Sequence, residues 1–151
     1  MKSIVKKSLL FFVGILAPFF SSFAQEYAVI TTIESVVPMG IGRSRMISNQ
    51  QEMDVDAFTT ERKQGTDTDQ GQIRRRDLKI DNLEETKMLN FFSATGINFQ
   101  NIASNDAMIS SKLTQMAANG WELAFVVSGV ESDGGETDGQ GIFITRYIFK
   151  R

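Results

Sequence analysis

Carboxylates are the side chains of this 151-residue protein whose spacing could support catalysis. Glu122 lies in a predicted strand, and Glu131, Asp133, Glu136 and Asp138 follow in and around a glycine-rich stretch. Two carboxyl groups about 5–10 Å apart across a cleft can hydrolyse a glycosidic bond. The later four residues crowd a loop, which holds catalytic geometry poorly. We therefore assign no catalytic residue and keep a small carboxylate-dependent hydrolase as an alternative.

Calcium binding is a second chemistry that acidic loops can support. Asp133, Glu136 and Asp138 form one acidic group, and Asp67 with Asp69 resembles half of a calcium loop. A complete loop also needs a third ligand, a glycine and a distant glutamate at fixed spacing. Neither stretch has this pattern. We expect solvated loops, with no bound metal and no cofactor.

Two arginine-containing segments could contact anions. The glycine-rich loop 40–45 carries Arg43 and Arg45 but matches neither a dinucleotide-binding nor a phosphate-loop pattern. We interpret it as a turn with charged flanks. The run Arg74–Arg76 has Asp69, Asp77 and Asp81 close by, which indicates a solvated face of mixed charge.

The chain contains no cysteine and no histidine. Their absence excludes cysteine nucleophiles, Ser-His-Asp triads, thiol redox chemistry and zinc sites built from those residues. Any enzyme here would need carboxylates, lysine, tyrosine or a Ser-Lys pair. The fold must also be stabilised by packing without disulfides.

Residues 1–24 have the order of a secretory signal peptide. Three lysines precede an apolar run from Leu9 to Phe20, and small residues end at Ala24. The run is shorter than the ~20 residues of a membrane anchor. We expect cleavage before Gln25, export to the periplasm or the extracellular space, and no membrane span afterwards.

Export would leave 151 − 24 = 127 residues, enough for one domain with its own core. Because the three lysines leave with the signal, the formal net charge changes from −2 to −2 − 3 = −5. A mildly acidic exported domain is a poor candidate for binding nucleic acid.

Four segments have clear periodicity. Residues 27–37 are rich in β-branched residues and predict a strand. Met108, Ile109, Leu113 and Met116 share one face of a helix that we expect to be capped by Ser104 or Asn105 and to end at Gly120. The alternating segments 121–131 and 142–151 then predict a hairpin with a long tip.

The middle of the chain is harder to interpret. Residues 53–58 and 72–80 could be two strands of a hairpin around a loop at 64–71. Asp81 and Glu84 match a capping box, which predicts a helix ending at Gly96. The alternating residues 96–102 would connect it to the main helix as an extended segment or a short strand.

Trp121, the only tryptophan, begins the first strand of the C-terminal hairpin. Strict alternation places Leu123, Phe125 and Val127 on its side, with Glu122, Ala124 and Val126 opposite. We therefore expect a largely buried indole between this strand and the main helix.

The helix, the Gly-Trp-Glu-Leu motif and the Tyr-x-Phe-Lys-Arg end resemble a small bacterial family, domain of unknown function 4177. The matching residues are Leu113, Gly120, Trp121, Glu122, Leu123, Tyr147, Phe149, Lys150 and Arg151, with strand 27–33 as the family's first strand. The resemblance implies a strand-helix-strand-strand fold and no assigned activity. Residues 43–80 lie outside its pattern and are expected to be an insertion.

The sequence thus predicts a single α+β domain over residues 25–151. We expect a small mixed or antiparallel sheet with a strand-helix-strand-strand core, one main helix on one face, and an extra hairpin or helix from the insertion. The function it favours is a non-catalytic binding or interaction module of the cell envelope with a protein or envelope partner. The alternative is the carboxylate-dependent hydrolase acting on an envelope glycan.

Overall fold

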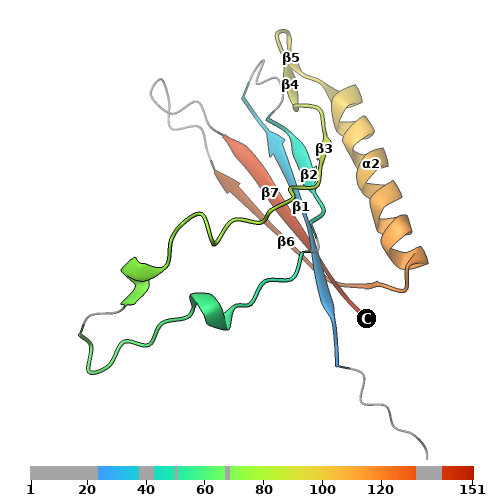
Figure 1. Cartoon of the computed structure of the whole chain (residues 1–151). Helices are drawn as coiled ribbons and strands as arrows, with labels where there is room; N and C mark the ends of the chain where they lie inside the picture. Colours follow the sequence, from blue (N-terminus) through green and yellow to red (C-terminus); the bar gives the residue numbers. More distant parts are fainter. Residues whose placement is uncertain (1–23, 38–42, 50, 67–68, 132–140) are drawn as a thin grey trace, which may run out of the picture.

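A computed structural model describes residues 24–37, 43–49, 51–66, 69–131 and 141–151. Its main element is a five-stranded antiparallel sheet in the order β3-β2-β1-β7-β6. The strands are β1 (Tyr27–Ser35), β2 (Arg45–Ile47), β3 (Glu85–Lys87), β6 (Glu122–Glu131) and β7 (Ile142–Lys150). One long helix, α2 (Phe99–Ala118), lies along one face of this sheet (Figure 1). The α+β prediction, with an antiparallel sheet and one main helix, is confirmed.

The centre of the sheet is formed by β1 and β7, the first and the last strand of the fold. β1 pairs with β7 over nine residues, from Tyr27 opposite Lys150 to Ser35 opposite Ile142. β7 also pairs with β6, so the predicted C-terminal hairpin is confirmed. The β-branched residues of β1 suit this central position, because their side chains pack well on a pleated surface with neighbours on both sides.

Helix α2 begins earlier than predicted. Asn98 is its N-cap and accepts a hydrogen bond from the backbone N–H of Asn101 at 3.1 Å, so neither Ser104 nor Asn105 caps it. Its end is as predicted, because Gly120 has φ +83°, a conformation that glycine adopts without a steric penalty.

The core lies between α2 and the β2-β1-β7 part of the sheet. Its buried apolar members come from four elements and one connecting segment: Ala28, Ile30, Met46, Met88, Met116 and Phe149. Met108, Ile109 and Leu113 of α2 pack against this cluster, together with Trp121 and Tyr147. The helical apolar face inferred from sequence is therefore the face that contacts the sheet.

The predicted helix from Asp81 to Gly96 is wrong. This segment contains β3 and a small hairpin of β4 (Phe92–Ser93) with β5 (Gly96–Ile97). Its backbone is held from outside the segment, because the N–H of Met88 donates to Ser44 at 3.0 Å and the N–H of Phe91 to Ser35 at 3.1 Å. Pairing with distant strands has overridden the local capping signal.

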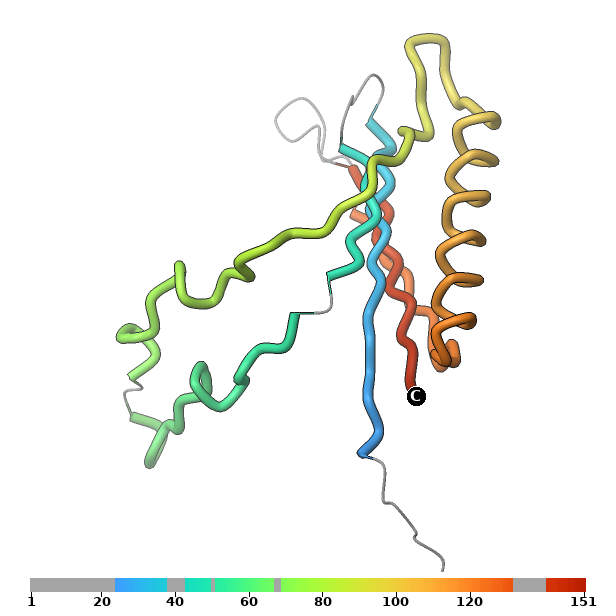
Figure 2. The backbone as a smooth tube through the Cα atoms, turned by 45° about the vertical axis from the view of Figure 1, so that its right-hand side comes forward, coloured from blue at the N-terminus to red at the C-terminus, as the bar shows by residue number. Residues whose placement is uncertain are grey.

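The described residues between 49 and 84, which we call the arm, project away from the sheet on the side away from α2 (Figures 1 and 2). The strands predicted at 53–58 and 72–80 are wrong. The arm's described secondary structure is limited to 3-10 turns at Asp56–Phe58 and Asp69–Gln72. Val55 and Leu78 remain exposed. Their alternating pattern did not produce strands, because no facing surface buries the apolar side.

Candidate functional site

The structure separates the two described carboxylates of the proposed catalytic group. Glu122 and Glu131 lie at opposite ends of β6, opposite Lys150 and Ile142 of β7. At about 3.3 Å per residue, their nine-residue separation corresponds to about 30 Å. The carboxylate of Glu122 instead pairs with Lys150 at 3.6 Å. Asp133, Glu136 and Asp138 lie outside the described residues.

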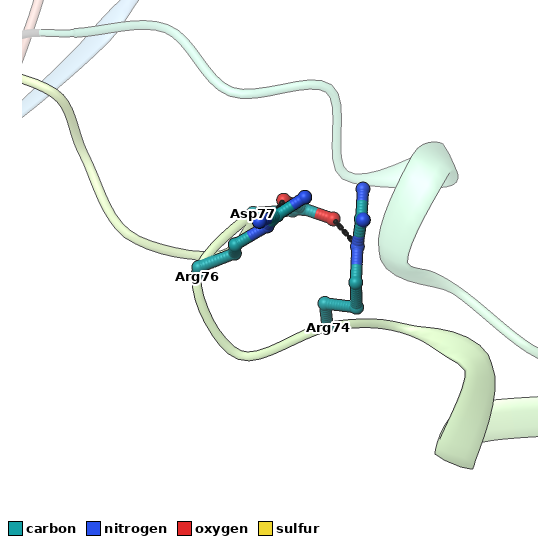
Figure 3. Close-up of polar contacts among 3 residues, drawn as sticks. All are labelled: Arg74, Arg76 and Asp77. Carbon is teal, nitrogen blue, oxygen red and sulfur yellow. Dashed lines mark hydrogen bonds and ion pairs between the residues drawn. The ribbon is translucent and has the colours of Figure 1, made fainter.

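The arginine run forms local ion pairs on the arm. Arg74 and Arg76 both contact the carboxylate of Asp77, at 2.8 and 3.2 Å, as Figure 3 shows. All three side chains are exposed to solvent. The expected solvated face of mixed charge is confirmed for these residues.

Two further charged residues singled out from the sequence also have partners. Arg45 forms an ion pair with Glu85 across β2 and β3, and Asp69 accepts a hydrogen bond from Gln72 at 3.3 Å. Asp67 and residues 40–42 of the glycine-rich loop lie outside the described residues. Within the described ranges, no group of three or more acidic side chains is placed to bind a metal ion.

A polar contact that the sequence did not reveal holds α2 to the sheet. Asn105 is fully buried and clamps the backbone of Leu89, accepting from its N–H at 2.9 Å and donating to its carbonyl at 2.7 Å. The same amide donates to Glu34 at 2.8 Å. Asn105 lies four residues before Ile109, on the apolar face of the helix. A polar residue at this position was the signal from which its burial could have been predicted.

Glu34 is the described carboxyl group with a perturbed pKa. Partial burial raises its pKa, Asp106 raises it further, and the hydrogen bond from Asn105 acts in the opposite direction. Burial also raises the pKa of Tyr147, and the negative charges of Glu34 and Asp106 raise it further. Asp106 is exposed on α2. Among the described residues, Glu34 therefore has no second enclosed carboxyl group beside it to form the pair used in glycoside hydrolysis.

Glu34→Gln is expected to stabilise the protein at neutral pH. Because the folded-state pKa of Glu34 is raised, its ionisation favours the unfolded chain as pH increases through the unfolded and then the folded value. Glutamine does not ionise, so it removes this loss of stability, and its side-chain oxygen can still accept the hydrogen bond from Asn105. The gain in unfolding free energy, measured in urea at several pH values, should disappear below the unfolded pKa of about 4.3.

Glu26→Gln is the matched control, because Glu26 is exposed and bonds Arg151 at the surface. It should show no comparable gain at neutral pH. A gain for Glu34→Gln that persists at pH 3 would contradict the explanation based on ionisation.

Trp121 is half-buried, so the prediction of a largely buried indole is only partly correct. Its inner part packs against the core, but the guanidinium of Arg151 lies over the ring at 4.4 Å from the centroid. Arg151 is held there by Glu26, to which it donates at 2.7 Å. Trp121 thus has one ring face covered by Arg151 of its own chain.

Arg151→Ala is expected to increase quenching of the tryptophan fluorescence by acrylamide. The guanidinium shields one ring face, and Trp121 is the only tryptophan in the chain. Arg146→Ala is the control, because that arginine is exposed in the middle of β7. Equal quenching in both variants would show that Arg151 does not cover the ring in solution.

Two of the surface grooves border the core cluster. One, of about 530 Å³, lies between α2 and the β2-β3 edge, and its lining includes Met46, Met108 and Lys112 but no carboxylate. The other, of about 490 Å³, lies beside Trp121 and is lined by Glu26 and Glu52 among others. Both glutamates are exposed.

Strand β6 is the most exposed apolar element of the sheet. The register runs from Leu123 opposite Phe149 to Phe125 opposite Ile148, so Ala124 is an extra residue. This bulge reverses the alternation after Leu123. Phe125 and Val127 consequently lie on the face away from α2, and the prediction that they share the side of Trp121 and Leu123 is wrong.

Both faces of β6 carry solvent-exposed side chains. Five apolar residues of the strand are between 41% and 65% exposed: Leu123, Phe125, Val126, Val127 and Val130. α2 covers the β1 and β2 side of the sheet and leaves most of β6 uncovered. Its outer edge is also unpaired among the described residues.

The face of the sheet away from α2 is apolar as well. Val29 of β1 is 41% exposed there, and Phe125 and Val127 continue the surface on β6. Ile33, Ile144 and Ile148 lie between them and are half-buried. We call these six residues the open face. An extended apolar patch of this kind on a small domain marks an interaction surface.

Comparison of the chain with protein-family models, curated proteins and solved structures gives no match. Within the part of the chain described here, no helix is both long enough and apolar enough to cross a bilayer.

Proposed function

We propose that this protein is exported and serves as a non-catalytic interaction module of the cell envelope. The open face is the observation that carries this proposal. It offers apolar side chains from β1, β7 and β6 of an antiparallel sheet, without a helix over it in the described structure. Burying such a surface against a partner removes apolar area from water and favours association.

The charged N-terminal start and apolar run support the export part of the proposal. The strand-helix-strand-strand order implied by domain of unknown function 4177 is present as β1, α2, β6 and β7. We propose membership of that family with residues 43–80 as an insertion, although β2 lies within the insertion and joins the main sheet.

The partner expected is an envelope protein with an apolar surface. Two charged side chains border the open face: Arg146 lies opposite Val127, and Arg45 lies opposite Ile33. Nucleic acid is not a suitable partner, because the proposed mature chain carries a formal charge of −5 and Arg74 and Arg76 of the arm are paired with Asp77.

Affinity capture from the envelope fraction tests the proposal. The recovered protein should begin at Gln25 and bring a partner with it. Val29→Lys, which places a charge on the open face, should abolish capture. Leu78→Lys is the matched control, because Leu78 is a similarly exposed apolar residue on the arm. Capture that survives Val29→Lys would contradict a role for the open face.

The alternative of a carboxylate-dependent hydrolase has one structural observation in its favour. Glu26 and Glu52 line the same groove as Trp121 and Tyr27, a combination that could contact a glycan. Against it, Glu26 is engaged by Arg151 at 2.7 Å. Turnover of an envelope glycan by the purified protein, lost in both Glu26→Gln and Glu52→Gln, would favour this alternative over the interaction module.

A further inference from the structure

Strand β6 has a composition that does not fit its position at the edge of the sheet. Residues 123–127 are five consecutive apolar residues, a pattern typical of strands covered on both faces. Among the described residues, no strand pairs with the outer edge of β6, and side chains on both of its faces are exposed. A long apolar edge strand readily pairs with another strand.

We propose that β6 pairs antiparallel with β6 of a second copy, around a two-fold axis at Ser128. This inference goes beyond the proposed function, since it concerns the edge of the sheet and self-association. The bulge at Ala124 leaves Phe125–Glu131 as the regular stretch of the strand, and Ser128 is its midpoint. An axis there uses the whole stretch and keeps the bulge outside the new pairing.

This register is self-complementary on the α2 side of the sheet. It places Val126 opposite Val130 of the second copy, and Ser128 opposite itself. On either side of these valines lie Tyr147 and Phe143, which are their partners in β7. The dimer would thus form apolar strips from residues that are 41–61% exposed in the monomer, apart from the half-buried Tyr147.

The register is also complementary in charge on the open face. It places Glu131 of one copy opposite Phe125 of the other, in the row of Ile148. Arg146 lies two residues from Ile148 along β7 and on the same face. Its Cα is therefore about 12 Å from that of Glu131 in the second copy. Extended arginine and glutamate side chains can bridge this separation. No two like charges face each other in the regular stretch, which would otherwise disfavour pairing.

The opposite edge of the sheet explains why association should stop at two copies. β3 has three residues, and Glu85 and Lys87 place charges at both its ends. Short charged edges are protected against strand addition. An isologous contact through β6 alone closes at a dimer.

Charge replacement at the axis tests the dimer. The purified protein should be a dimer by analytical ultracentrifugation at micromolar concentration. Ser128→Lys and Ser128→Glu should each weaken the dimer at least about tenfold, because residue 128 faces its own copy. An equimolar mixture of the two variants should recover the dimer. The fluorescence of Trp121 reports that each variant remains folded.

Cysteine cross-linking tests the register, since the chain has no cysteine of its own. Directly opposed residues lie about 4.5–5.5 Å apart, within the range of a disulfide. Ser128→Cys should therefore form a covalent dimer on oxidation. Val126→Cys is the control and should not, because its two copies are separated by four residues along the strand, about 13 Å. Mixing Val126→Cys with Val130→Cys should restore cross-linking.

A monomer at all concentrations, or a dimer unaffected by both charged variants, would overturn the proposal. A dimer in which Val126→Cys links as well as Ser128→Cys would also overturn this register. These results are independent of the capture experiment, which depends on Val29 of β1. Absence of the dimer with normal partner capture, or the reverse, would show which of the two proposals is wrong.

Discussion

Phe149→Ala is expected to lower the free energy of unfolding by about 3–5 kcal/mol, the usual cost of removing a fully buried aromatic ring. Phe149 is 1% exposed and belongs to the cluster that joins β7 to β1 and α2. It lies opposite Ala28 and Leu123 on the two neighbouring strands. A domain of this size has about 5–15 kcal/mol in total, so this one change should leave it marginally stable.

Phe143→Ala is the matched control, because Phe143 is on the same strand and the same face. It is 41% exposed, and its main aromatic contact is Phe91, with ring centroids 5.8 Å apart. Its loss should be about 1 kcal/mol. Urea unfolding followed by Trp121 fluorescence measures both. If Phe149→Ala is insoluble, Phe149→Leu should show a smaller loss in the same assay. Equal losses at positions 149 and 143 would contradict the described core.

Asn105→Ala is expected to cost about 3 kcal/mol or more. It leaves the backbone N–H and carbonyl of Leu89 without their partner, and it removes the bond to Glu34. Each buried polar group left unpaired costs about 1–3 kcal/mol. The gain in helix propensity from alanine is below 1 kcal/mol and offsets only part of this.

Ser110→Ala is the control for Asn105→Ala, because Ser110 is exposed on the same helix. It should change the unfolding free energy by less than about 0.5 kcal/mol. Hydrogen exchange should also show that Asn105→Ala exposes the amide of Leu89 before global unfolding. Protection of that amide equal to the parent would show that Asn105 does not hold the segment to α2.

Hydrogen bonds from Ser44 and Asn105 explain why the structure of residues 81–96 could not be predicted. The local sequence of this segment contains a capping box and a terminal glycine, which are typical of a helix. The segment instead follows hydrogen-bond partners that are distant in sequence. Ser44, which bonds Asn90 at 2.9 Å, is 46 residues away, and Asn105 is 16 residues from Leu89. Partners at such separations cannot be identified from a local pattern.

The candidate interaction surface was also only partly predictable from the sequence. Sequence correctly located β6 and β7, but strict alternation placed Phe125 and Val127 in the core. A single bulged residue, Ala124, turns them to the other face. Of the candidate carboxylates of the alternative hydrolase, Glu122 and Glu131 lie at opposite ends of β6. The open face was visible only once the positions of α2 and the strands were known.

The sequence by itself determined the α+β class, the main helix and the strands β1, β6 and β7. These elements follow from the spacing of apolar residues and from glycine at a helix end, which act within a few residues. Tertiary structure alone decided which strand is central, which face α2 covers, and how far Trp121 is buried. Strand order and layer packing depend on contacts between residues far apart in the chain, so the exposure of β6 and of Arg151 over Trp121 could not be derived from local sequence.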